Sequence, residues 1–472
     1  MLTLAAASML TGVGMMVANP QGVKAQSCTV QNPCAVDPGL RTGAAGAGKY
    51  IAGLTTNQQA IEARLFQIFT EVNNVTGGTQ QKSVGLGPLF NSNSCNSCHA
   101  QPAPGGSSPV VNPLFAIYNV QGGTNSMPFF NTTSGPVNVA RFAYQSDGVT
   151  PDGGVHNLFT IAGRTDAPGC TVGLVTQPDF AGASASGNLR LRLTTPTFGD
   201  GLLEIIRDRD IITNKNSNVA AKAALGISGH ENRTDDDGTI SRFGWKAQNK
   251  SLMYFSGEAY NVEMGISNEL FPNERNETPG CTPPFPVKSG FLTHGVPDDR
   301  TDPTAAGGKG NVNVTGDQNR FSLFMRYLDQ PTPGPSSPST MNGQTQFNNI
   351  GCNLCHTQYF ITPTSAIAAL SNVKANLYSD LLVHDMGPNL ADDITQGTAT
   401  GDQFRTAPLW GVGQRTFFLH DGRTSDIVQA IEQHYSDANS KYPASEANAV
   451  VNAFNNLPVS DQQDLINFLR SL

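Results

Sequence analysis

Two short stretches of the chain carry the same three chemistry-bearing residues at the same spacing. The first reads CNSCH over residues 95–99, and the second reads CNLCH over residues 352–356. C-x-x-C-H is the signature of covalent c-type haem attachment. Its two thiols reach the two vinyl groups of one porphyrin, and the adjacent imidazole faces the iron. The motifs therefore predict two covalently bound haems c, attached through Cys95, Cys98, His99, Cys352, Cys355 and His356.

Other uses of a C-x-x-C pair fit less well. Zinc half-sites and redox dithiols share this spacing. A tetrahedral zinc site needs a second pair of Cys or His ligands nearby, and neither copy has one. Chance is a poor explanation for two copies in a chain with only 8 Cys and 8 His.

The composition limits the classes of function. The 472 residues suffice for two or three domains. Charged residues make up only 14 %, whereas Gly (49) and Pro (30) are abundant, which favours short elements joined by ordered turns. The net charge of −8 and the lack of a Lys/Arg cluster argue against nucleic acid as a partner.

Amphipathic patterns flank the motifs. Apolar residues at 61, 65, 68, 69 and 72 predict a helix over residues 61–75, before the first motif. The last residues, 459–472, predict a helix that Ser460 caps. We therefore expect a mainly α fold with two cytochrome c-like haem domains, over residues 26–317 and 318–472. The first domain should hold a long Gly/Pro-rich insertion with some β structure.

The N-terminal residues are typical of an export signal. Residues 2–17 are apolar or small, and Val23 and Ala25 supply the small residues required before a cleavage site. We expect a signal peptide over residues 1–25, a periplasmic or secreted protein, and no membrane span in the mature chain. Because nothing basic precedes the apolar run, a membrane anchor is the alternative, although about 16 apolar residues are few for a span.

Four cysteines lie outside the two motifs. An exported chain can form disulfides, and Cys28 with Cys34, and Cys170 with Cys281, are candidate pairs. Disulfide pairing depends on geometry that spacing alone does not determine.

Several longer stretches read GLGPLFNSNSCNSCH, RFGWKAQ, EMGISNELFP, YSDLLVHDMGPNLAD, FRTAPLWGVG and FLHDGRTSDIVQAIEQH. Together they resemble the di-haem oxidoreductase family of peroxidase type, which is related to bacterial di-haem cytochrome c peroxidase and to the MauG-type enzymes. The similarity extends over about residues 51–472 and is patchy between 101 and 194. It implies an enzyme in which peroxide reacts at the N-terminal haem and electrons pass through the C-terminal haem.

The resemblance also implies ligands for the second haem. In the family's peroxidases, a His-x-Gly motif is followed fourteen residues later by the Met that ligates the electron-transfer haem. Here His420 begins the sequence HDG, and His434 stands at that distance in a segment that predicts a capped helix. The implied iron ligands are His356 and His434, with His420 nearby and Met386 as the alternative. Imidazole in place of thioether predicts a lower reduction potential.

The sequence offers few candidates for a distal ligand of the first haem. No histidine occurs between residues 100 and 155, so the iron is open, holds water, or is ligated by His156. By resemblance, Trp245 lies between the haems and Glu263 is the catalytic carboxylate, although the family separates these residues by twenty positions rather than eighteen. No residue matches the family's distal Gln, and Glu204 is the alternative carboxylate.

These residue types suit peroxide chemistry. A carboxylate above the iron can move a proton between the peroxide oxygens, and burial raises its pKa toward the working range. An indole between haems can pass an electron. The partners expected are hydrogen peroxide or another small oxidant, and a small redox protein as electron donor. The alternatives are MauG-like oxidation of a partner's side chain and a pure electron carrier. Calcium between the haem halves is a further option.

Overall fold

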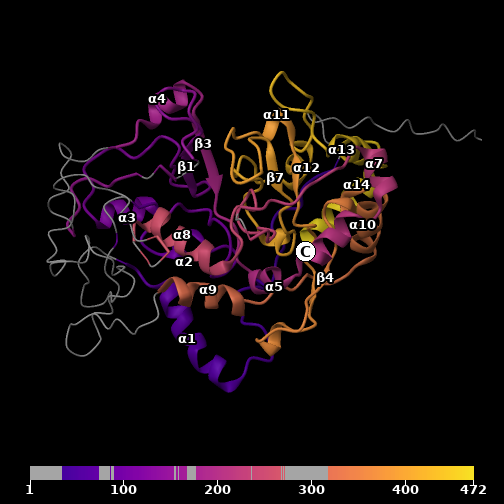
Figure 1. The fold of residues 1–472 in the computed structure, drawn as a ribbon, viewed down its shortest axis with the longest axis horizontal. Helices are drawn as coiled ribbons and strands as arrows, with labels where there is room; N and C mark the ends of the chain where they lie inside the picture. The colour runs from indigo at the N-terminus through magenta and orange to yellow at the C-terminus, as the bar shows by residue number, and fades with distance from the viewer. Residues whose placement is uncertain are drawn as a thin grey trace, which may run out of the picture.

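The computed structural model describes residues 35–73, 86, 90–153, 156–157, 159–166, 177–234, 237–266, 268, 270–271 and 317–472. This part of the chain is mainly helical, as expected, with small antiparallel sheets (Figure 1). The expected signal peptide and the four cysteines outside the motifs lie outside the described residues, so these expectations stay predictions. No described helix has the length and apolar character needed to cross a membrane.

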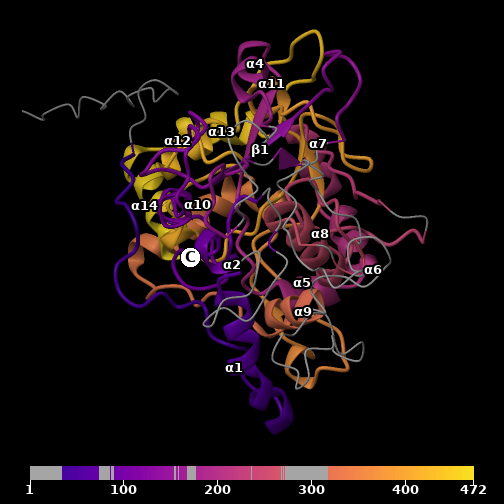
Figure 2. The same ribbon diagram turned by 90° about the vertical axis from the view of Figure 1, so that its left-hand side faces the viewer.

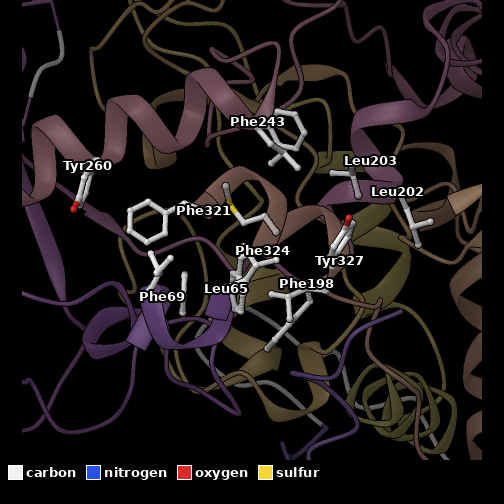
Figure 3. Packing of buried hydrophobic residues seen from close by; sticks show 14 of the residues in the cluster. Leu65, Phe69, Phe198, Leu202, Leu203, Phe243, Tyr260, Phe321, Phe324 and Tyr327 are labelled. Carbon is white, nitrogen blue, oxygen red and sulfur yellow. The ribbon is translucent and has the colours of Figure 1, made fainter. Parts of the chain in front are cut away.

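One group of helices packs around the first motif. It comprises α1 (Thr56–Thr70), α5 (Asp200–Ile205), α8 (Leu252–Met264) and α9 (Asp317–Tyr327). Figure 3 shows aromatic side chains from these helices meeting in the core. Phe69 stacks on Phe324 with ring centroids 4.2 Å apart, and Tyr260 meets Phe321 edge to face at 4.9 Å. Such contacts stabilise the core beyond the area that they bury.

The helix predicted over residues 61–75 begins and ends earlier than expected. Thr55 and Gln58 form a capping box, which satisfies backbone donors at the first turn and starts α1 at Thr56. The domain boundary expected between residues 317 and 318 stays a prediction. Helix α9, which begins at Asp317 and so spans this boundary, packs against α1, α5 and α8 of the preceding part of the chain.

A second group of helices surrounds the other motif. It comprises α10 (Pro338–Asn349), α12 (Ile427–Glu432), α13 (Asn448–Asn455) and α14 (Val459–Ser471), which lie together on one side of the molecule in Figures 1 and 2. Its core contains Phe347, Phe454, Leu465, Ile466 and Phe468. The prediction that Ser460 caps the last helix is wrong, because the helix begins at Val459 with Pro458 at its N-cap and no side-chain cap.

Short strands tie distant segments together. The three-stranded sheet has the order β2 (His156–Asn157), β1 (Asn138–Phe142) and β3 (Leu189–Leu193). Two antiparallel pairs follow, β4 (Phe360–Ile361) with β5 (Lys374–Ala375) and β6 (Val383–Asp385) with β7 (Gln403–Arg405). The remaining helices are α2 (Cys95–Cys98), α3 (Leu114–Val120), α4 (Phe180–Ala185), α6 (Asp208–Lys215), α7 (Val219–Leu225) and α11 (Gly387–Leu390).

Helices α10 and α14 approach closely at a glycine. A Cβ atom added at Gly343 would lie 1.9 Å from the backbone oxygen of Asp464, so no larger residue fits without moving one helix. We therefore expect Gly343→Ala to lower the free energy of unfolding by about 1–3 kcal/mol, although alanine has the higher helix propensity. Urea unfolding would measure the change.

The matched control is Asn348→Ala, at an exposed position of the same helix. It should leave the stability unchanged or raise it slightly, because it gains helix propensity without touching α14. Equal stability of Gly343→Ala and the wild type would contradict the close helix contact.

Candidate functional site

Each C-x-x-C-H motif opens on a large cavity. Cys352, Cys355 and His356 line one cavity of about 1450 Å³, counting the space open to solvent. The residues of the first motif line another, of about 1130 Å³. A third cavity in the described part of the chain is much smaller, at about 310 Å³. We call the first two the C-terminal and the N-terminal cavity.

The first motif presents its histidine in a fixed orientation. The motif forms the single turn α2, in which the backbone NH of His99 donates to the Cys95 oxygen at 3.0 Å. Nδ1 of His99 donates to the Gly106 oxygen at 3.2 Å, which leaves Nε2 as the lone-pair nitrogen. Burial lowers the pKa of His99 to about 4, so the imidazole is neutral and suited to binding a metal.

The second motif repeats this arrangement. Nδ1 of His356 donates to the Tyr378 oxygen at 2.9 Å. Burial lowers the pKa of His356 to about 4. Tyr378 itself has a left-handed backbone, with φ of 51°, which is uncommon for a residue with a large side chain. The strained backbone at Tyr378 turns the Tyr378 carbonyl toward the His356 imidazole.

His434 lies on the wall of the same C-terminal cavity. Asp426 caps α12 by accepting from the backbone NH groups of Val428 and Gln429, and the chain leaves the helix just before His434. Its Nδ1 donates to the Ala430 oxygen at 2.6 Å, so Nε2 is again the lone-pair nitrogen. Burial lowers the pKa of His434. Met386, the alternative predicted ligand, also lines this cavity. Both predicted ligands of the second haem therefore lie on the wall of the C-terminal cavity.

Trp245 lines both cavities. Its Nε1 donates to the Leu193 oxygen at 2.8 Å, and its backbone oxygen accepts from the Arg405 NH at 2.9 Å. Strand β3 thereby holds the indole, and β7 holds the backbone of Trp245. Trp245 lies on the walls of both cavities, and the expectation that it lies between two haems stays a prediction.

His420 contacts Trp245 and also lines the C-terminal cavity. Its ring meets the indole edge to face at 6.4 Å and stacks on Phe404 at 4.3 Å. The Leu193 NH donates to the His420 oxygen at 2.6 Å, so one residue of β3 holds both aromatic groups. Burial lowers the pKa of His420 to about 4. His420 of the HDG sequence therefore forms part of the C-terminal cavity wall, beside Trp245.

Glu263 lines the N-terminal cavity from α8. Burial and, to a smaller extent, the charge of Glu258 raise the pKa of its carboxyl to about 7, and Arg141 opposes the rise. The alternative carboxylate, Glu204, does not line either cavity. It forms a two-pronged ion pair with Arg326, with contacts of 2.5 and 2.9 Å. The geometry thus favours Glu263 over Glu204.

Sequence reasoning missed other polar residues of the N-terminal cavity: Arg141, Arg192, Gln248 and Glu258. Gln248 lies only three positions after Trp245, and Glu258 precedes Glu263 on α8. The arginines extend from the neighbouring strands β1 and β3. Only the backbone of His156 is described, paired with Arg141 in β2, so its proposed role as a distal ligand lies outside the described side chains.

Two buried arginines indicate that the C-terminal cavity suits a haem. Arg405 and Arg415 both line it, and Nη1 of Arg405 has no hydrogen-bond partner among the described residues. Burial lowers the pKa of both guanidiniums to about 10. Nε of Arg405 donates to the Gly244 oxygen at 3.1 Å, so Nη1 is the donor left for a ligand, and a buried donor without an acceptor is unfavourable. The cavity thus combines apolar walls, attachment thiols, an imidazole and cations that suit an apolar macrocycle with carboxylate arms.

Among the described residues, Cys355, Asp380 and His384 form a group with potential metal-ligand atoms close together. Cys355 belongs to the attachment motif, and both ring nitrogens of His384 face carboxylates, Asp380 at 3.0 Å and Glu446 at 2.7 Å. The group is therefore a poor ion site. No oxygen-rich calcium site emerges near FRTAPLWGVG in the described residues, and calcium stays a prediction.

Comparison with solved structures gives distant likenesses. They include hydrazine synthase from Kuenenia stuttgartiensis (17 % identity, 33 % of this chain, 55 % of that chain, TM-score 0.22). A MauG-like protein associated with microbial copper homeostasis gives 16 % identity, 33 % and 52 % coverage and a TM-score of 0.23. The diheme peroxidase BthA from Burkholderia thailandensis gives 12 % identity, 67 % and 91 % coverage and a TM-score of 0.28.

The chain spans about half the length of the first two of these structures. All three TM-scores lie below 0.5, so these likenesses do not establish the fold. No curated protein matches the sequence. The family model described as "Di-haem oxidoreductase, putative peroxidase" matches residues 181–472, more than half of the chain. The protein therefore belongs to the di-haem oxidoreductase family.

Proposed function

We propose that the protein is a di-haem c oxidoreductase of peroxidase type. Membership of its family implies haem cofactors and a redox role. In the proposal, peroxide reacts at the N-terminal haem and electrons arrive through the C-terminal haem. The observation that carries it is the unequal histidine content of two cavities that share Trp245 on their walls. His434, His420 and His384 line the C-terminal cavity in addition to His356, whereas His99 is the only described histidine lining the other.

The chain would hold one haem through Cys95, Cys98 and His99. It would hold the other through Cys352, Cys355 and His356, with His434 as a second iron ligand. When bound, the haem supplies an iron that coordinates peroxide and exchanges electrons with it. The backbone carbonyls of Gly106, Tyr378 and Ala430 fix the tautomers that this ligation needs.

Glu263 is the group that moves the proton in the N-terminal cavity. Reductive cleavage of hydrogen peroxide requires a proton to leave one oxygen and reach the other before water departs. A carboxylate with a pKa near 7 can accept that proton and return it at neutral pH. Arg141 opposes the pKa rise, which keeps part of the population ionised.

Trp245 provides the contact between the two sites. Trp245 lines both cavities, and the hydrogen bond from its Nε1 and the ring contact with His420 keep the indole in one orientation. A rigid aromatic ring at this position shortens the distance that an electron must travel through saturated groups. We therefore assign it the coupling of the two haems.

The electron donor in this proposal is a small redox protein, and the reaction takes place in the periplasm or outside the cell. The apolar N-terminal run and the haem c motifs support this location. Oxidation of a partner's side chain, as in MauG-type enzymes, is the alternative. Those enzymes carry a Tyr oxygen as the distal ligand of the second haem, whereas this chain brings His434 to the corresponding cavity.

The ligation of the C-terminal haem can be tested by ferric-state electron paramagnetic resonance. We expect one high-spin haem and one low-spin haem in the wild type. His434→Ala should abolish the low-spin signal, because it removes an axial imidazole. Met386→Leu serves as the control and should keep the signal. Two low-spin ferric haems in the wild type, with no high-spin signal, would contradict an open N-terminal site.

The proton-transfer role predicts a pH dependence. The rate constant for the reaction with peroxide should rise with pH through about 7 and level off, because the Glu263 carboxylate accepts the proton only when ionised. Glu263→Gln should lower this rate by about 10²–10⁴-fold and remove the pH step. Stopped-flow spectroscopy would measure both.

Glu258→Gln distinguishes this role from a general effect of charge. Removing the Glu258 charge should lower the pKa of Glu263, so the step moves to lower pH while the rate at high pH is retained. A full rate in Glu263→Gln, with both haems bound, would show that another group moves the proton.

A further inference from the structure

Three buried ionisable residues are hydrogen-bonded in a row, and two of them, His384 and Glu446, line the C-terminal cavity. His384 lies between two carboxylates: its Nε2 is 3.0 Å from Asp380, and its Nδ1 is 2.7 Å from Glu446. The three side chains are only 4 %, 1 % and 8 % exposed, in the order His384, Asp380, Glu446. We call them the Asp380–His384–Glu446 cluster.

The geometry determines the charge of this cluster. An ionised carboxylate only accepts hydrogen bonds, so each ring nitrogen of His384 must carry a proton to bind its neighbour. The imidazole is then a cation between two anions, and the cluster holds one net negative charge. Burial disfavours the Glu446 anion, but the hydrogen bond from His384 lowers the pKa of Glu446 to about 2.

Surrounding backbone groups keep the cluster rigid. The Ser228 NH and hydroxyl donate to Glu446 at 2.9 and 2.6 Å. Gly229 packs against the imidazole so closely that a Cβ there would lie 2.4 Å from Cε1 of His384. The Asp380 NH donates to the Cys355 oxygen at 2.8 Å, which ties the cluster directly to the attachment motif.

The cluster also reaches the atom that would join the haem. Nδ1 of His384 lies 3.8 Å from Sγ of Cys355, and both His384 and Glu446 line the cavity. The Cys355 thiol here stands in for the thioether sulfur of an attached haem. At the first motif, the sulfur of Cys98 has the uncharged hydroxyl of Ser97 at 3.9 Å instead.

We propose that the Asp380–His384–Glu446 cluster is a positioning and charge-setting group that holds the reduction potential of the C-terminal haem low. The inference rests on the proposed function, because it requires a haem attached at Cys355. A net negative charge beside a buried haem opposes the addition of an electron, and the low dielectric of the site strengthens this effect. Electrons are thereby directed from this haem toward the N-terminal site.

Glu446→Gln tests the proposal in the haem-loaded protein. The amide oxygen of Gln still accepts from His384 Nδ1, while one negative charge is removed. We expect the midpoint potential of the low-spin haem to shift to more positive values in spectropotentiometric titration. Asp393→Asn is the matched control, because Asp393 pairs with Arg190 and Lys441 and lines neither cavity. It should cause a clearly smaller shift.

Asp380→Asn is a second variant, in case Glu446→Gln fails to fold. Its backbone NH still binds Cys355, and its expected effect is also a positive shift. A purely structural role would change haem loading or stability without a directed shift in potential. Unchanged potentials in the folded variants would overturn the cluster's role even if peroxide reactivity is normal. If the variants shift the midpoint potential but the wild-type protein does not react with peroxide, the role of the cluster stands and only the proposed function is overturned.

Discussion

The two sites depend on a single interaction used three times: an imidazole Nδ1–H bound to a backbone carbonyl. His99, His356 and His434 each make this bond, to Gly106, Tyr378 and Ala430. It fixes the tautomer, so Nε2 keeps its lone pair, and burial keeps each ring neutral. Without it, either nitrogen could carry the proton, and a histidine near iron would be a ligand only part of the time.

The two motifs are chemically equal but lie in unequal surroundings. The C-terminal cavity is lined by three further histidines beside His356 and by two members of the charged cluster beside Cys355. The N-terminal cavity has no further described histidine and is lined instead by two glutamates and a glutamine, and both cavities have two buried arginines. These contrasts suit a division between a site that supplies electrons and a site where protons and peroxide meet. Trp245 lines both cavities and is the residue that we propose couples the two sites.

The sequence predicted the residues that local spacing determines. The motifs, the mainly helical fold and the capped helix before His434 follow from short-range patterns, and the structure contains them. Contacts between residues that stand far apart in the chain were not predicted. His384 and Glu446 stand far apart in the chain and meet only because β6 packs against the segment before α13. Glu204 looked like a catalytic candidate until Arg326 was seen to pair with it.

The hydrogen bonds of Leu193 make strand register a condition for contact between the sites. Its carbonyl holds the Trp245 indole, and its amide holds the HDG loop through His420. Successive residues of a strand point in opposite directions, so a slip of β3 by one position would turn both groups away at once. Correct pairing of the five-residue strand β3 is therefore also a condition for the contact between the Trp245 indole and His420.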